Sequence, residues 1–145
     1  MGGEIIYQVT AAEVGEIKKD PSVLAGFKPD SRESIDLGVS GYPIDIVLDY
    51  LNDDIGVAEL CLAVSCDKDV GSDEFHAKTL NSKQVRAASA AMDKITRSAF
   101  KDAFETTHAG SDEAAGDELY ELFDDIRDFF KRAVKKRRSL VKTIY

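Results

Sequence analysis

The side chains best suited to hold a metal ion in this sequence are two cysteines and two histidines. Cys61 and Cys66 have C-x4-C spacing, whereas His76 and His108 lie far apart in the chain. Structural zinc sites usually pair their histidines with about three to five residues between them, and this pairing is missing. We therefore expect no zinc site, and the apolar neighbours of both cysteines favour small core residues with free thiols.

The acidic segment at residues 67–74 (D-K-D-V-G-S-D-E) resembles a calcium-binding loop in composition. In an EF-hand register that starts at Asp67, Ser72 replaces the required glycine and Lys78 replaces the bidentate glutamate, so we expect a solvated turn. No serine or cysteine motif accompanies either histidine in a pattern that would suggest nucleophilic catalysis. The sequence thus indicates no catalytic residue, no metal ligand and no cofactor.

Length and composition predict one globular domain over residues 1–145, since 43% of the residues are hydrophobic and 32% are charged. No apolar run approaches the roughly 20 residues of a membrane span, and no basic leader precedes the first strand-like segment. We therefore expect a cytoplasmic protein without membrane contact. The 27 acidic and 19 basic side chains give a net charge of -8, which disfavours a nucleic-acid partner and favours a basic protein.

The N-terminal part is predicted to contain a strand at residues 4–9, a helix at 11–19, one helical turn at 22–27 and a polar loop at 28–34. Thr10 and Glu13 have the spacing of a capping box, in which each side chain bonds the backbone N–H of the other residue. This local pattern fixes where the first helix begins.

The C-terminal part is predicted to begin with a strand at 75–80 and a helix whose capping box is formed by Asn81 and Gln84. A short helix carrying Phe100 and Phe104 follows, and then a polar connection at 106–116. A long helix at 112–136 and a strand at 139–145 complete the prediction. One apolar stripe on the long helix comprises Leu119, Leu122, Phe123, Ile126, Phe129, Phe130, Ala133 and Val134. Arg137 would continue that stripe, so the helix must end before it. Three short strands between helices predict an α+β fold with neighbouring terminal strands.

Seven of the twelve residues from Lys131 to Lys142 are basic, which is typical of an anion-binding patch. The helix dipole offers another explanation, because cations at a helix C-terminus are stabilising. We favour this structural interpretation.

Residues 44–51 (I-D-I-V-L-D-Y-L) fit both a strand and a helix, and residues 55–66 are similarly ambiguous, with a preference for helix. If 44–51 is helical, Ile46 and Tyr50 point away from the stripe of Ile44, Val47 and Leu51. An open face there would be an apolar surface with an acidic rim, as expected of a protein contact. The candidate site residues are Tyr42, Asp45, Ile46, Asp49, Tyr50, Asp53 and Asp54. Burial of both faces is the alternative.

The order of these features resembles the YfbM-like family of bacterial proteins, a domain of unknown function. The resemblance rests on Met1-Gly2 followed by I-I-Y, the segment 41–51 ending in D-Y-L, T-L-N-S-K-Q-V at 79–85, and a long amphipathic helix before S-L-V-K-T-I-Y. It implies an α+β fold and a helix at 43–52. The family's tryptophan and histidine in that helix correspond to Ile44 and Leu48 here, whereas Asp45 and Leu51 are retained.

Two hypotheses of function follow. The first is a non-enzymatic protein-interaction module, of the inhibitor or immunity type, that masks a basic partner. The second is a small-ligand-binding domain or an enzyme with a pocket near residues 41–54. The absence of catalytic motifs and the net charge of -8 favour the first.

Overall fold

The computed structural model describes residues 3–144, and in this range five antiparallel strands form one sheet in the order β2-β1-β5-β4-β3. The strands are β1 (Glu4–Val9), β2 (Ser34–Gly38), β3 (Lys68–Asp69), β4 (Ala77–Leu80) and β5 (Ser139–Ile144). The last strand lies in the middle of the sheet and pairs with β1 on one side and β4 on the other. The prediction that the terminal strands are neighbours is thus confirmed.

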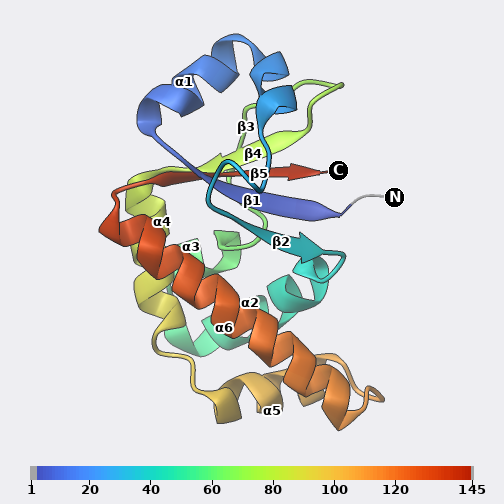
Figure 1. Cartoon of the computed structure of the whole chain (residues 1–145). Helices are drawn as coiled ribbons and strands as arrows, with labels where there is room; N and C mark the ends of the chain where they lie inside the picture. Colours follow the sequence, from blue (N-terminus) through green and yellow to red (C-terminus); the bar gives the residue numbers. More distant parts are fainter. Residues whose placement is uncertain (1–2, 145) are drawn as a thin grey trace.

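The helices lie on both faces of the sheet (Figure 1). They are α1 (Ala11–Lys19), the 3-10 helix η1 (Pro21–Gly26), α2 (Gly41–Ile55), α3 (Ala58–Leu62), α4 (Ser82–Met92), α5 (Arg97–Thr107) and α6 (Glu113–Lys135). The first two cover one face, and the helices from α2 to α6 form a thicker layer on the other. The predicted α+β class is therefore confirmed. No helix in residues 3–144 combines the length and apolarity needed to cross a membrane.

Strand β1 supplies side chains to both cores because successive residues of a strand point to opposite faces. Ile6 belongs to the large core under helices α2–α6, whereas Ile5, Tyr7 and Val9 belong to the smaller core under α1 and η1. Both faces are covered, which explains why Ile5, Ile6 and Tyr7 are consecutive apolar residues and why even Gln8 of this strand is buried.

Helix α6 buries the predicted stripe against the large core. Phe123, Ile126, Phe129 and Phe130 are fully inaccessible to solvent, whereas Leu122 and Val134 at the margins are partly buried. Both predicted capping boxes, at Thr10 and Asn81, are also formed. Amphipathic helices with local capping signals are therefore the part of this fold that the sequence predicts best.

Two strands and several boundaries differ from the sequence-based predictions. Strand β2 begins at Ser34, the last residue of the predicted loop, and covers residues for which no element was predicted, and the acidic turn contains the two-residue strand β3, so three predicted strands become five. Both missed strands lie at sheet edges and are stabilised by backbone pairing with a neighbouring strand; β2 alternates over only five residues, and the two exposed residues of β3 have no apolar pattern. The strand predicted at 75–80 begins at Ala77, and the polar connection predicted at 106–116 shortens to 108–112.

Candidate functional site

Helix α2 resolves the ambiguous segment 44–51, and the strand alternative is wrong. Ile44, Val47 and Leu48 are fully buried at helical spacing, and Pro43 lies in the first turn, where its missing N–H costs nothing. Gly56 ends the helix in the left-handed conformation, with φ of 70°. Of the second ambiguous segment, 55–66, only the short helix α3 is regular.

The seven candidate site residues lie together on the opposite face of α2. At about 100° per residue they span about half of the circumference, on the side away from the buried stripe. Tyr42 is 73% exposed and Tyr50 is 46% exposed, while Ile46 is partly exposed. The carboxylates of Asp49, Asp53 and Asp54 are exposed, and that of Asp45 is partly buried. With Val39, which is 79% exposed just before the helix, these residues are called the acidic aromatic face below.

The net charge of the chain is concentrated in the sequence segment that contains this face, and five of its carboxylates lie on α2 and α3. From Glu33 to Asp67 the sequence holds eight acidic side chains and no lysine, arginine or histidine. The net charge of this stretch thus equals the total of -8, and the remaining residues are balanced. Such a segregated charge creates a local negative potential that a net-charge count alone does not reveal.

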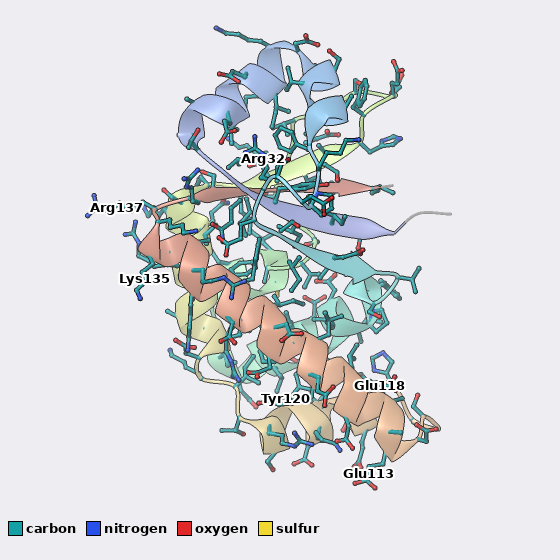
Figure 2. The ribbon with its side chains drawn as sticks, in the orientation of Figure 1. Arg32, Glu113, Glu118, Tyr120, Lys135 and Arg137 are labelled. Carbon is teal, nitrogen blue, oxygen red and sulfur yellow. The ribbon has the colours of Figure 1, made fainter. Side chains whose placement is uncertain are left out.

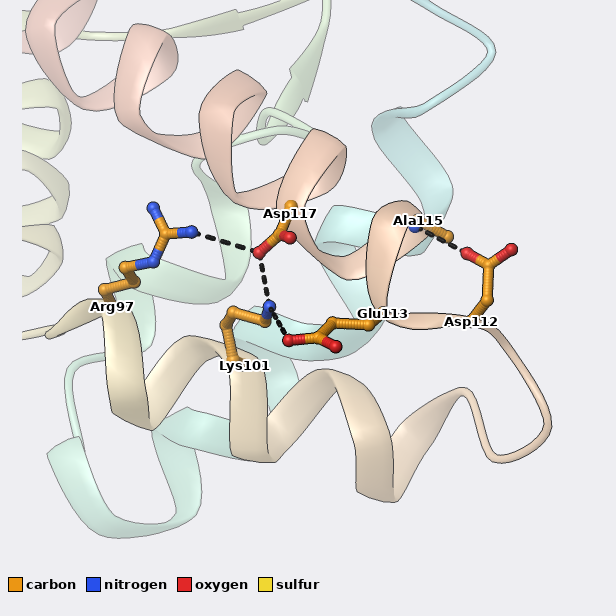
Figure 3. Close-up of polar contacts among 6 residues, drawn as sticks. All are labelled: Arg97, Lys101, Asp112, Glu113, Ala115 and Asp117. Atoms are coloured by element: carbon orange, nitrogen blue, oxygen red, sulfur yellow. Dashed lines mark hydrogen bonds and ion pairs between the residues drawn. The ribbon is translucent and has the colours of Figure 1, made fainter.

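The acidic residues of α2 and α3 make no ion pair within the described part of the chain. The nine ion pairs between residues 3 and 144 all use carboxylates of other elements. Asp117 of α6, for example, binds both Arg97 and Lys101 of α5 (Figure 3). Asp49, Asp53 and Asp54 have no such cation beside them. Their charge is therefore available to a partner.

A cleft of about 180 Å³ adjoins this face at the start of α2, lined by Glu4, Gly41, Tyr42, Asp45, Val64, Ser65 and Lys142. Lys142 Nζ lies 2.9 Å from Glu4 Oε2. Asp45 Oδ1 is buried and makes no hydrogen bond. Burial raises the pKa of the Asp45 carboxyl from 3.8 to about 6, with a further increase from Asp49 and an opposing effect of Lys142. The residue beside the cleft thus has one carboxylate oxygen that is buried without a hydrogen-bond partner, which is unusual for a buried polar atom.

Glu4, Ser65 and Lys142 also line this cleft, although nothing in the sequence pattern assigns them to it. They come from β1, the turn after α3 and β5, and only the pairing of β1 with β5 brings the first and last of them together. The hydrophobic pattern predicts those two strands, but it does not give their register. A pair of opposite charges on two strands predicted to be neighbours is the signal that could have found them.

The cysteines and histidines differ in their surroundings. Cys66 is buried, as predicted, and burial raises the pKa of its thiol to about 12. Cys61 is only partly buried, and its Sγ accepts a hydrogen bond from Asn52 Nδ2 at 3.3 Å. The prediction of two core cysteines is therefore wrong for Cys61. The ring of His108 stacks on Phe104, and His76 is exposed. Residues 3–144 contain no group of three or more His, Cys, Asp or Glu placed to hold a metal ion.

These features define an α+β protein whose most distinctive surface is one acidic helix face. Residues 3–143 match the family described as Domain of unknown function (DUF1877), and the chain belongs to that family. Its fold is similar to the crystal structure of YfbM from Escherichia coli, a protein of unknown function, with a TM-score of 0.69, 10% identity and 99% of each chain covered. The predicted YfbM-like membership is thus confirmed. No curated protein matches the chain.

Proposed function

We propose that this protein is a non-enzymatic interaction module, of the inhibitor or immunity type, that binds a basic protein through the acidic aromatic face. The observation that carries the proposal is that exposed Tyr42 and Tyr50 lie beside the carboxylates of Asp49, Asp53 and Asp54, which form no ion pair within residues 3–144. Tyrosine is enriched at the centre of protein interfaces, where its ring is buried and its hydroxyl can still bond. The two free thiols favour a reducing compartment, so the proposed location is the cytoplasm.

The face has the anatomy of a contact that is guided by charge. Its apolar centre consists of Val39, Tyr42, Ile46 and Tyr50, and Asp49, Asp53 and Asp54 surround that centre. Carboxylates at an interface rim increase the association rate with a basic partner more than they increase affinity. Binding should therefore weaken as salt is added, because salt screens the exposed charges.

A crosslinking experiment tests the proposal in the native host. Tyr42 is replaced by a photoreactive benzoylphenylalanine, and adducts are collected at low and high salt. The triple variant Asp49→Asn/Asp53→Asn/Asp54→Asn removes the rim, while Asp73→Asn/Glu74→Gln/Glu121→Gln removes the same charge from exposed positions elsewhere. We expect a discrete adduct with a basic protein, reduced at least tenfold by the first set and little by the second.

Two results would contradict an interaction at this face. One is that no discrete adduct forms with Tyr42 replaced. The other is that the rim and control variants reduce the adduct equally, which would make the effect one of total charge. A lysine- and arginine-rich peptide, titrated by fluorescence anisotropy, gives a parallel comparison of the two sets without the native partner.

A second candidate function is supported by the cleft at Asp45. Its lining includes the Asp45 carboxyl and Lys142, which could bind a small polar molecule, and this would make the protein a ligand-binding domain or an enzyme. A thermal-shift screen of metabolites tests this, since a ligand at about 100 times its Kd stabilises a protein by about 2.7 kcal/mol. A ligand of the cleft should lose its effect in Asp45→Asn but not in Asp53→Asn.

A further inference from the structure

A second pocket lies where the first turns of α4 meet the turn between α6 and β5. It has a volume of about 390 Å³ and is lined by Ser82, Arg86, Val134 and Arg137. It shares no residue with the acidic aromatic face or with the cleft at Asp45. Figure 2 shows Lys135 and Arg137 at this end of α6, with Glu113 and Glu118 at the other end. The two ends of the longest helix thus carry opposite charge.

The arginines of the protein divide into two groups by their partners. Four of the seven, Arg32, Arg97, Arg127 and Arg132, form ion pairs with carboxylates. Arg86, Arg137 and Arg138 form none within residues 3–144, and all three lie at this junction. Arg86 and Arg137 line the pocket from two different elements. The guanidinium groups that the fold leaves without a carboxylate are therefore gathered at one place.

The basic run of residues 131–142 is only partly explained by internal pairing or by the helix dipole. Lys131, Arg132, Lys136 and Lys142 bind Asp93, Glu33, Glu33 and Glu4, respectively. Lys135, Arg137 and Arg138 have no ion pair within the described residues, and neither has Lys83 in the first turn of α4. Together with Arg86, five cations without a carboxylate therefore belong to the two segments that form the pocket.

The backbone of Arg137 adds an independent observation. Its φ of 55° is in the left-handed region, at the position after a helix where glycine is preferred. The N–H of Arg138 bonds the carbonyl of Ala133 at 2.9 Å, and the N–H of Arg137 bonds that of Val134 at 3.1 Å, which closes the helix. Any L-residue with a side chain is strained here. The position therefore carries an arginine at a cost to stability, and strain of this kind is often associated with function.

We propose that this pocket binds the phosphate groups of a small anionic metabolite. Two guanidinium groups on facing elements can each donate two parallel hydrogen bonds to phosphate oxygens. Ser82 adds a hydroxyl donor at the first residue of α4, where the helix dipole also favours an anion. The pocket volume is within the range of about 300 to 1,000 Å³ that is usual for small ligands. This site is independent of the proposed protein interaction.

Calorimetric titration with pyrophosphate at low salt tests the site directly. We expect saturable binding by the wild-type protein and at least a tenfold loss of affinity in Arg86→Gln/Arg137→Gly. The control Lys28→Gln/Lys94→Gln removes the same charge from exposed lysines that line no part of the pocket, and it should change affinity less than threefold. Circular dichroism confirms that each variant is folded.

Arg137→Gly alone separates a binding role from a structural one. Glycine relieves the left-handed strain, so the melting temperature should rise while pyrophosphate affinity falls. A residue that only completes the fold would not move these two quantities in opposite directions.

Three results would overturn the proposal. The first is the absence of saturable pyrophosphate binding, and the second is an equal loss of affinity in the control variant. The third is tighter binding of a single-stranded oligonucleotide than of pyrophosphate, lost with the same arginines, which would assign the surface to a nucleic-acid backbone instead.

Discussion

The carboxylate of Glu4 lies against Gly41, in the first turn of α2, so closely that a Cβ atom at residue 41 would overlap Glu4 Oε1. The same carboxylate binds Lys142 of β5. A negative charge at a helix N-terminus is favourable, and this one joins two central strands to the helix that carries the candidate site. The missing side chain at Gly41 is what makes room for the contact.

Gly41→Ala is expected to destabilise the protein by no more than about 1 kcal/mol, because the new methyl group overlaps the end of the flexible Glu4 side chain, which can shift and weaken its contact with Lys142. In a Glu4→Ala background that conflict is absent. The same substitution should then be neutral or stabilising by up to about 1 kcal/mol, since alanine favours helix over glycine. Urea denaturation of the four proteins measures the difference. Equal effects in both backgrounds would show that Glu4 is not the obstacle.

The free energy of unfolding should decrease as the pH rises from about 4 to about 6, because Asp45 titrates in this range. Its pKa is raised to about 6 by burial and by Asp49 and Glu4, against the effect of Lys142, so the folded protein holds this proton more tightly than the unfolded chain. The contribution is present below the unfolded pKa of about 3.9 and is lost as pH rises through the folded value. Because the group is partly exposed, solvent screening limits the effect to about 1 kcal/mol.

Asp45→Asn should accordingly raise the free energy of unfolding at pH 7 and flatten its decrease between pH 4 and pH 6. Asp53→Asn makes the same change of charge on the exposed side of the helix and serves as the control. Guanidinium titrations at several pH values provide the measurement. An Asp45 carboxyl that titrates below pH 4 by NMR would disprove the assignment.

Phe130→Ala should cost about 3 to 5 kcal/mol, because the ring is fully buried in the large core and a cavity would remain. Leu122→Ala, at the partly buried margin of the same helix, should cost clearly less. Chemical denaturation distinguishes the two. A loss below about 1 kcal/mol for Phe130→Ala, typical of an ordinary substitution, would mean that the ring of Phe130 does not lie in the core.

Two glycines should respond to alanine in opposite directions. A Cβ at Gly71 would collide with backbone atoms of Phe75 and Ala77, which cannot move aside as a side chain can, so Gly71→Ala should cost at least about 1 to 3 kcal/mol. At Gly15, inside α1, nothing lies within 4 Å of the added atom. Gly15→Ala should stabilise by about 0.5 to 1 kcal/mol. Thermal melts of both variants test the pair, and a neutral Gly71→Ala would contradict the tight turn.

What the sequence predicts well in this protein is what a few neighbouring residues determine. Asn81 and Gln84 cap α4 through their own backbone, so their spacing alone locates the start of the helix. The exposed face of α2 also follows from spacing once the segment is known to be helical. Spacing does not show whether another element covers Ile46 and Tyr50, because this depends on the packing of the whole chain.

The parts that the sequence does not predict depend on contacts between distant segments. Strand β2 pairs with the free edge of β1, and its alternation of Ile35 and Leu37 with polar residues is too short to establish a strand without that partner. The cleft at Asp45 requires the register that places Ile6 opposite Lys142. The anion pocket requires α4 and the end of α6 to meet, and a basic run by itself does not reveal which of its cations keep a carboxylate.

The central position of β5 has a consequence for synthesis on the ribosome. While this strand is still in the exit tunnel, β1 and β4 cannot be joined, and each presents an unpaired edge to the surrounding solution. The helices between them can form early, because their capping contacts are local. Completion of the sheet is then a late step that closes both edges at once. Until that step the nascent chain is a substrate for chaperones that bind exposed strands.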